Sequence, residues 1–205
     1  MKLPRTLARE PAVAGSVKLP VLGAIALVFY AIHAFVYYTL IARSPEGALW
    51  ACHVGCAVVG VGCIARRALP VAIGTLWLIY GGTVWGIDLA MGANVIPTSV
   101  LTHIGGLVVA ALALRELRWV RGASLAATVA LFVLLGLTRL LTPASANINL
   151  VFAVTPGFER SFPTFGRYFL FLFGTAFAVF VAADVALSFA LSRRSPPVSA
   201  APPQS

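Results

Sequence analysis

The side chains best suited to chemistry in this sequence are three histidines, an aspartate and two cysteines. The histidines are His33, His53 and His103, and long apolar stretches surround each of them. A neutral imidazole can take a proton from a thiol or hydroxyl group, or it can bind a transition metal. Because ionisable groups are costly in an apolar environment, each of these histidines is a candidate functional residue.

Two of the cysteines lie close to one of these histidines in the sequence. On a helix, the spacing of Cys52 and Cys56 places both thiols on one stripe near His53 and prevents a disulfide between them. A thiol beside an imidazole can attack a lipid ester. In this interpretation His103 is the general base, Cys56 or Cys52 is the nucleophile, and two further groups orient or polarise the reactants. The predicted catalytic set is therefore His103, Cys56, Cys52, His53 and Asp88.

Two other interpretations use the same residues. The three imidazoles and Asp88 are ligand types that suit zinc or a redox metal. The sequence contains no HExxH motif, no histidine pair spaced by four residues and no CxxC motif. Alternatively, each histidine forms its own hydrogen bond, and the polar groups serve packing or ligand binding in a non-catalytic protein. The acyl-chemistry interpretation requires no cofactor.

The elements that must position these side chains are apolar helices. Of the 205 residues, 60% are hydrophobic and 10% are charged, whereas a typical soluble domain has about 25% charged residues. A water-soluble fold of this length cannot hide so much apolar surface, so the solvent must be a lipid bilayer. The apolar runs are continuous rather than alternating, which predicts helices and not a β-barrel.

Six apolar segments predict an all-α bundle of six transmembrane helices, near residues 19–41, 48–65, 69–91, 97–114, 123–141 and 167–191. A basic N-terminal segment (1–18) precedes this domain (19–191), and a disordered tail rich in Pro, Ser and Ala (192–205) follows it. Of the 15 Lys and Arg residues, about 11 fall on the N-terminal side of the membrane. This asymmetry predicts that both termini are cytoplasmic. We expect a multipass protein of the cell membrane.

Helix geometry places the polar groups at similar depths. By the rise per residue, His33 lies about 12 Å inside the outer end of its segment, and His53 and His103 lie about 8–9 Å inside theirs. Asp88 is within about 5 Å of the rim. The four groups come from four segments and share the outer half of the predicted bundle, which favours a common polar pocket.

The net charge of +9 does not predict nucleic-acid binding. The basic residues lie mostly at segment ends, where they set topology and contact anionic lipids, so membrane lipids are the expected partners. Gly82 and Gly86 form a GxxxG motif, which predicts close packing within the bundle or a homo-oligomer. Four tryptophans near segment ends are interpreted as interface anchors: Trp50, Trp77, Trp85 and Trp119.

Four short motifs in the third and fourth segments occur in a similar order in a known family. They are Leu76-Trp77-Leu78-Ile79-Tyr80, Val95-Ile96-Pro97, His103 and Leu114-Arg115-Glu116-Leu117. This order resembles the androgen-induced-gene family of transmembrane hydrolases. The resemblance implies a multipass protein that cleaves fatty acid esters of hydroxy fatty acids with an intramembrane threonine and histidine.

In that resemblance, His103 falls on the catalytic histidine of the family. The nucleophilic threonine falls near Cys52 or His53, where this chain has no threonine. The resemblance thus implies either a cysteine nucleophile or a non-catalytic relative. The region of Asn147-Ile148-Asn149 and Pro156 also resembles related bacterial six-helix proteins, which implies a location in the bacterial inner membrane.

Overall fold

The computed structural model describes residues 18–192, and within this range every regular element is a helix. Six helical rods are present, and their bounds agree with the six predicted segments to within one turn. They are α1 with η1 (Lys18–Ile32, His33–Ile41), α2 (Ala51–Ile64), α3 (Ala68–Ala90), α4 with η3 and α5 (Pro97–Val100, Leu101–Gly105, Gly106–Ala113), α6 (Ala123–Leu141) and α7 (Phe165–Ser192). The predicted basic N-terminal segment and the predicted tail fall almost entirely on residues 1–17 and 193–205, outside the described residues.

Four of these rods have the length and apolar composition needed to cross a membrane: Lys18–Ile41, Ala68–Ala90, Ala123–Leu141 and Phe165–Leu191. Large apolar side chains cover the outside of the bundle, such as Leu140, which is 82% exposed, and Leu170, which is 71% exposed. A surface of this kind needs lipid rather than water around it. The chain is therefore a multipass α-helical membrane protein.

The second segment is shorter than predicted. Helix α2 has 14 residues, which makes it about 21 Å long, whereas the hydrocarbon layer is about 30 Å thick. A short 3₁₀ helix, η2 (Pro45–Leu49), occupies the residues predicted to begin this segment. Helix α2 therefore begins at Ala51, after η2 and Trp50.

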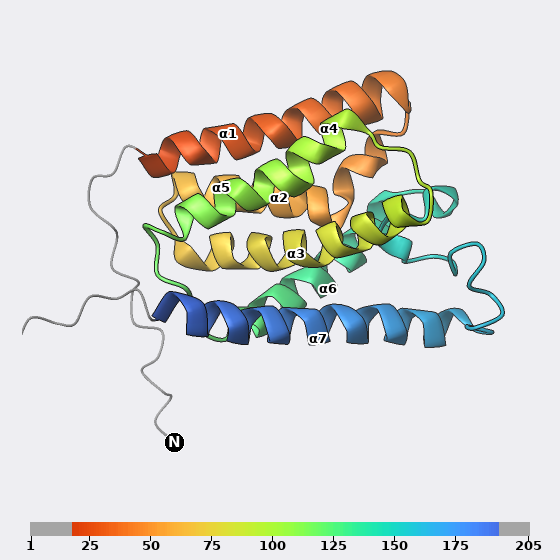
Figure 1. The fold of residues 1–205 in the computed structure, drawn as a ribbon. Helices are drawn as coiled ribbons and strands as arrows, with labels where there is room; N and C mark the ends of the chain where they lie inside the picture. Colours follow the sequence, from red (N-terminus) through yellow and green to blue (C-terminus); the bar gives the residue numbers. More distant parts are fainter. Residues whose placement is uncertain (1–17, 193–205) are drawn as a thin grey trace, which may run out of the picture.

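Figure 1 shows α1 and α7 on opposite sides of the bundle. Helix α2 packs against both α1 and α3, and α3 also packs against α6 and α7. The rod of residues 97–113 packs against α1, α2 and α3. The start of α1 and the end of α7 lie at the same end of the bundle (Figure 1).

Glycines on α2 allow the close approach of its neighbours. A Cβ on Gly60 would lie 2.8 Å from Leu27 Cγ and 2.9 Å from the carbonyl oxygen of Gly23 on α1. On the other side, a Cβ on Gly55 would lie 3.2 Å from the carbonyl oxygen of Gly74 on α3. Backbones this close require residues without side chains, so α2 is held tightly between α1 and α3.

The predicted GxxxG face on α3 makes no comparable contact within the described chain. A Cβ on Gly86 would meet nothing within 4 Å, and one on Gly82 would meet only Leu107, at 3.9 Å. This motif therefore does not set helix packing inside the bundle. A homo-oligomer through Gly82 and Gly86 remains a prediction.

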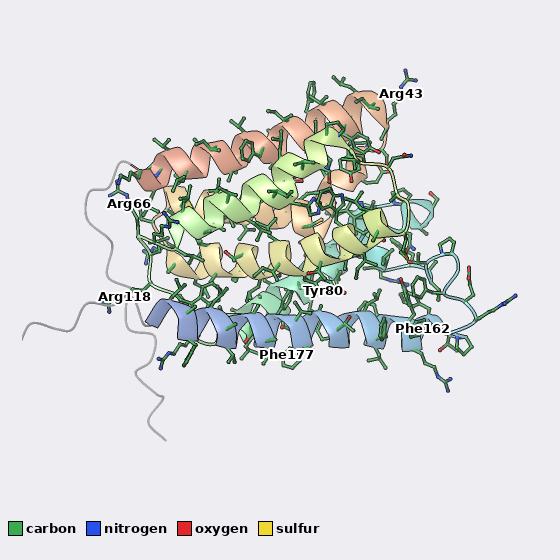
Figure 2. The ribbon with its side chains drawn as sticks, in the orientation of Figure 1. Arg43, Arg66, Tyr80, Arg118, Phe162 and Phe177 are labelled. Atoms are coloured by element: carbon green, nitrogen blue, oxygen red, sulfur yellow. The ribbon has the colours of Figure 1, made fainter. Side chains whose placement is uncertain are left out.

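A buried carboxylate ties the two last helices together near the end of the bundle where α7 ends. Asp184 on α7 accepts hydrogen bonds from Trp119 Nε1 (2.8 Å) and from the backbone and hydroxyl of Ser124 (3.0 and 2.9 Å). Figure 2 shows Arg66 and Arg118 at this same end, and Arg43 at the opposite end. That the end with Arg66 and Arg118 faces the cytoplasm remains a prediction from charge asymmetry.

Candidate functional site

A cavity of about 390 Å³ lies among α2, α3, α6, α7 and the rod of residues 97–113. Its lining includes four of the five predicted catalytic residues together with His33: His103, Cys52, His53 and Asp88. Of these, Asp88 is exposed, and the three histidines are buried. The rest of the wall is largely apolar, with side chains mainly from α6 and α7: Leu131, Leu135, Phe169, Leu172, Phe173, Ala176 and Phe180.

Two of the three histidines lie in π-helical turns. His33 begins the π-helix η1, and His103 lies in the π-helical segment η3, between α4 and α5. Such turns are rare and occur frequently at functional sites. A π-helical turn contains one more residue than an α-helical turn. The side chains that follow it therefore project from a different face of the helix. Here both imidazoles meet His53 of α2, at ring separations of 4.4 and 5.5 Å.

The hydrogen bonds of His33 and His53 define their protonation. His53 Nδ1 lies 3.3 Å from the carbonyl oxygen of Gly47, and because a carbonyl only accepts, Nδ1 carries the proton. His53 Nε2 is then an acceptor, and it lies 3.2 Å from His33 Nε2. His33 therefore donates from Nε2, and its Nδ1 accepts from the Thr98 hydroxyl at 2.8 Å. In this network both nitrogens of His53 are engaged.

The third imidazole keeps one nitrogen available. His103 Nδ1 lies 3.0 Å from the carbonyl oxygen of Ser99 and 3.1 Å from its hydroxyl oxygen. Because the carbonyl only accepts, the proton is assigned to Nδ1, and Nε2 of the neutral ring is then unprotonated. The ring stacks on Trp85 with centroids 4.8 Å apart and an interplanar angle of 7°. Trp85 thus holds His103, and the interpretation of Trp85 as an interface anchor missed this contact. Trp77, unlike the half-buried Trp85, is buried, and its Nε1 donates to the carbonyl oxygen of Ala127.

Cys52 joins the histidines at this end of the cavity. Its sulfur and ring nitrogens of His53 and His103 all lie within 4.8 Å of one another. Cys52 is the second residue of α2, where free backbone N–H groups and the helix dipole favour negative charge. Gly81 on α3 makes room for it, because a Cβ there would lie 3.5 Å from Cys52 Sγ and would overlap its Cβ.

Cys56 does not reach this cluster. It is fully buried between α1, α2 and α5, its thiol donates to the carbonyl oxygen of Ala26, and it does not line the cavity. Cys52 and Cys56 are one helical turn apart on the same side of α2. At Cys52 this side of the helix faces the cavity, and at Cys56 it is covered by the packed core. Within the cavity, the available thiol is that of Cys52.

The arrangement thus combines a thiol, two nearby imidazoles and an apolar chamber inside a membrane protein. No family model, curated protein or solved structure matches the chain. Its chemistry must therefore be argued from the side chains that line the cavity. A thiol within 4.8 Å of imidazole nitrogens is a candidate nucleophile with a nearby base, and the same side chains also form a metal-binding set.

A residue from the long loop 142–164 helps to position Cys52. Asn149 Oδ1 accepts from the backbone N–H of Ala51 at 2.7 Å, and its Nδ2 donates to the carbonyl oxygen of Leu49 (2.8 Å) and to Thr138 Oγ1 (3.0 Å). Its φ of 53° is in the left-handed region that Asn tolerates better than most residues. Asn149 thereby caps the start of α2, although it lies almost 100 residues further along the chain. The sole sequence signal for this role is the presence of an Asn in an irregular loop.

We predict that Asn149→Ala lowers the free energy of unfolding by about 2–4 kcal/mol, because three hydrogen bonds are lost and the first N–H of α2 is left unpaired. Thermal unfolding in detergent measures this change. The same variant should also speed alkylation of Cys52 by a thiol reagent, since the start of α2 is released. Asn147→Ala is the control: Asn147 bonds to Phe152 and Ala153 within the loop. Equal alkylation rates in the two variants would contradict a specific role for Asn149.

Proposed function

We propose that the protein is an intramembrane enzyme that hydrolyses lipid acyl esters or transfers their acyl group. The observation that carries this proposal is the grouping of Cys52 with His53 and His103 in the lining of a cavity whose remaining wall is largely apolar. The resemblance of residues 76–117 to transmembrane fatty-ester hydrolases supports the same chemistry. A location in the bacterial inner membrane is part of the proposal.

In this proposal Cys52 is the nucleophile and His103 is the general base. His103 is favoured over His53 because its Nε2 is unprotonated and free, whereas His53 Nε2 already accepts from His33. As the Cys52 sulfur bonds to the ester carbonyl carbon, its proton passes to His103. The carbon–oxygen bond to the alcohol then breaks, and the alcohol leaves with that proton.

Water completes the hydrolysis in the second half of the reaction. It attacks the thioester on Cys52 while His103 takes one of its protons, the fatty acid leaves, and the thiol regains the proton from His103. If an alcohol takes the place of water, the product is a new ester. Because the walls are apolar, each proton must move together with the bond changes, since an isolated charge would be costly there. The first turn of α2 favours the negative charge that develops.

The apolar part of the cavity sets the class of substrate. Phenylalanine and leucine side chains of α7, including Phe169 and Leu172, line the cavity together with Leu131 and Leu135 of α6. Such a wall binds a hydrocarbon chain by burial and offers it no polar partner. The expected substrate is therefore an ester with one long acyl chain, whose carbonyl group lies at Cys52.

Detection of the acyl-enzyme tests this proposal. Purified protein in lipid nanodiscs, kept free of metal with a chelator, is incubated with a panel of long-chain acyl esters. We expect free fatty acid, and an acyl adduct by intact-mass spectrometry on wild type but not on Cys52→Ser. Cys63→Ser is the matched control, because Cys63 is also a free thiol but is fully buried away from the cavity. No hydrolysis across the panel, or an adduct that persists in Cys52→Ser, would overturn the proposal.

A further inference from the structure

We infer that the same cluster binds one zinc-class divalent ion through His33, His53, His103 and Cys52, and that the bound ion blocks the acyl chemistry. The inhibitory consequence rests on the proposed function, because it requires Cys52 and His103 to be the reacting groups. Metal binding itself does not depend on that function, since it is a property of the four side chains.

The first support is the distance between two imidazole nitrogens. His33 Nε2 and His53 Nε2 lie 3.2 Å apart, and both residues are buried. Two nitrogens that are each about 2.0–2.1 Å from one tetrahedral zinc ion lie about 3.3 Å apart. Two unprotonated nitrogens at this separation repel each other unless a cation bridges them. The pair is thus held together either by a shared proton or by a metal ion.

The second support is that each histidine has an oxygen partner on its other nitrogen. His53 Nδ1 faces the carbonyl of Gly47, His103 Nδ1 faces the carbonyl of Ser99, and His33 Nδ1 faces the hydroxyl of Thr98. Histidines that bind metals almost always donate their second N–H in this way, which fixes the tautomer and the ring orientation. His33 is the one histidine that must change its tautomer, with the proton on Nδ1 instead of Nε2. Its Nδ1–H group then donates to the Thr98 hydroxyl oxygen. All three Nε2 atoms then carry lone pairs.

The third support is the thiol and the charge around it. Cys52 Sγ and ring nitrogens of His53 and His103 lie within 4.8 Å of one another, and His33 adjoins this group through its Nε2, 3.2 Å from His53 Nε2. Binding of one ion by all four residues requires these side chains to move closer together. On binding, the thiol loses its proton to solvent and becomes a thiolate ligand. Among the described residues that line the cavity there is no Lys or Arg to oppose a cation.

The number of ligands decides what the ion does. Three imidazoles and one thiolate fill a tetrahedral shell, which is the closed arrangement of structural zinc sites, whereas catalytic zinc keeps a position open for water. The ion would therefore not activate water. It would instead occupy the Cys52 sulfur and the free nitrogen of His103, which are the two atoms that the acyl chemistry requires. Metal binding would thus switch the enzyme off.

Cobalt and zinc binding test this inference without reference to activity. Purified protein in detergent is stripped with a chelator, dialysed and titrated with Co²⁺, and Zn²⁺ is then used to compete. We expect one ion per chain, with visible bands of tetrahedral Co²⁺ and a near-ultraviolet band from a sulfur ligand. Cys52→Ser should lose the sulfur band, while Cys63→Ser, the matched control, should keep it. His53→Ala should weaken Co²⁺ binding at least 100-fold, more than the roughly 10–100-fold typical of a lost outer partner.

The outcomes separate this inference from the proposed function. Absence of Co²⁺ binding in folded wild type, or spectra unchanged in both Cys52→Ser and folded His53→Ala, would overturn the metal site whether or not esters are hydrolysed. If folding of His53→Ala fails, the isosteric Cys52→Ser still decides through the sulfur band. When hydrolysis is present, one equivalent of Zn²⁺ should abolish it and chelator should restore it. Undiminished hydrolysis in the zinc-loaded protein would overturn the inhibitory role alone.

Discussion

Replacement of His103 by glutamine is expected to lower the rate of ester hydrolysis by about 10²–10⁴-fold, the usual contribution of a general base. The amide N–H of glutamine can still donate to the carbonyl of Ser99, as His103 Nδ1 does at 3.0 Å. Its side chain also fills much of the space over Trp85. The substitution therefore removes mainly the basic nitrogen. Turnover of a long-chain ester by the chelator-treated protein in nanodiscs measures the loss.

Two further measurements separate a catalytic role from a structural one. The thermal unfolding temperature of His103→Gln should stay close to that of wild type, so that lost activity cannot be attributed to unfolding. The residual rate should also lose the pH dependence that titration of the His103 imidazole gives to the wild-type reaction, since glutamine does not titrate. A folded His103→Gln protein that retains activity within threefold of wild type would show that His103 is not the base.

Filling the apolar part of the cavity should change the preferred chain length. Ala176 on α7 is 2% exposed and lines the cavity, so Ala176→Phe places a ring in the space proposed for the acyl chain. We expect the hydrolysis of long-chain esters to fall by about 10–200-fold, the range found when a hydrophobic pocket loses its fit. Short-chain esters, which do not reach this space, should be hydrolysed at nearly the wild-type rate.

Ala182→Phe is the matched control for this prediction. It makes the same change on the same helix, but Ala182 is exposed and does not line the cavity. Overpacking at Ala176 should also cost about 1–3 kcal/mol in stability, so both variants need a thermal unfolding measurement. If Ala176→Phe slows long and short esters equally, the acyl chain does not occupy this part of the cavity.

Some properties of this protein follow from its sequence alone, because they depend on local composition. Continuous apolar runs of about 20 residues can satisfy their backbone groups in lipid only as helices, so the segments near 69–91 and 123–141 were predicted almost to the residue. The cost of ionisable groups in such runs singled out His33, His53 and His103 as candidates. Depth along each helix also follows from residue number, and it predicted that these groups share one pocket.

The identity of the pocket residues was decided by tertiary structure. Cys52 and Cys56 have equivalent sequence contexts, but only Cys52 lines the cavity, because α2 leaves the cavity for the packed core within one turn. Sequence spacing cannot show at which residue a face of α2 becomes covered by a neighbouring helix. In the same way, hydropathy could not show that Trp85 stacks on an imidazole or that Asn149 caps a helix almost 100 residues away.

The geometry of the histidines depends most on the fold. His33 begins one π-helical segment and His103 lies within another, and helix packing brings both rings to His53 of α2. Such turns form where packing against other helices outweighs the small preference for α-helical hydrogen bonds, and that balance involves residues distant in the sequence. The sequence therefore determined which groups lie within apolar helices and how far along each helix. Only helix packing decided which of them meet.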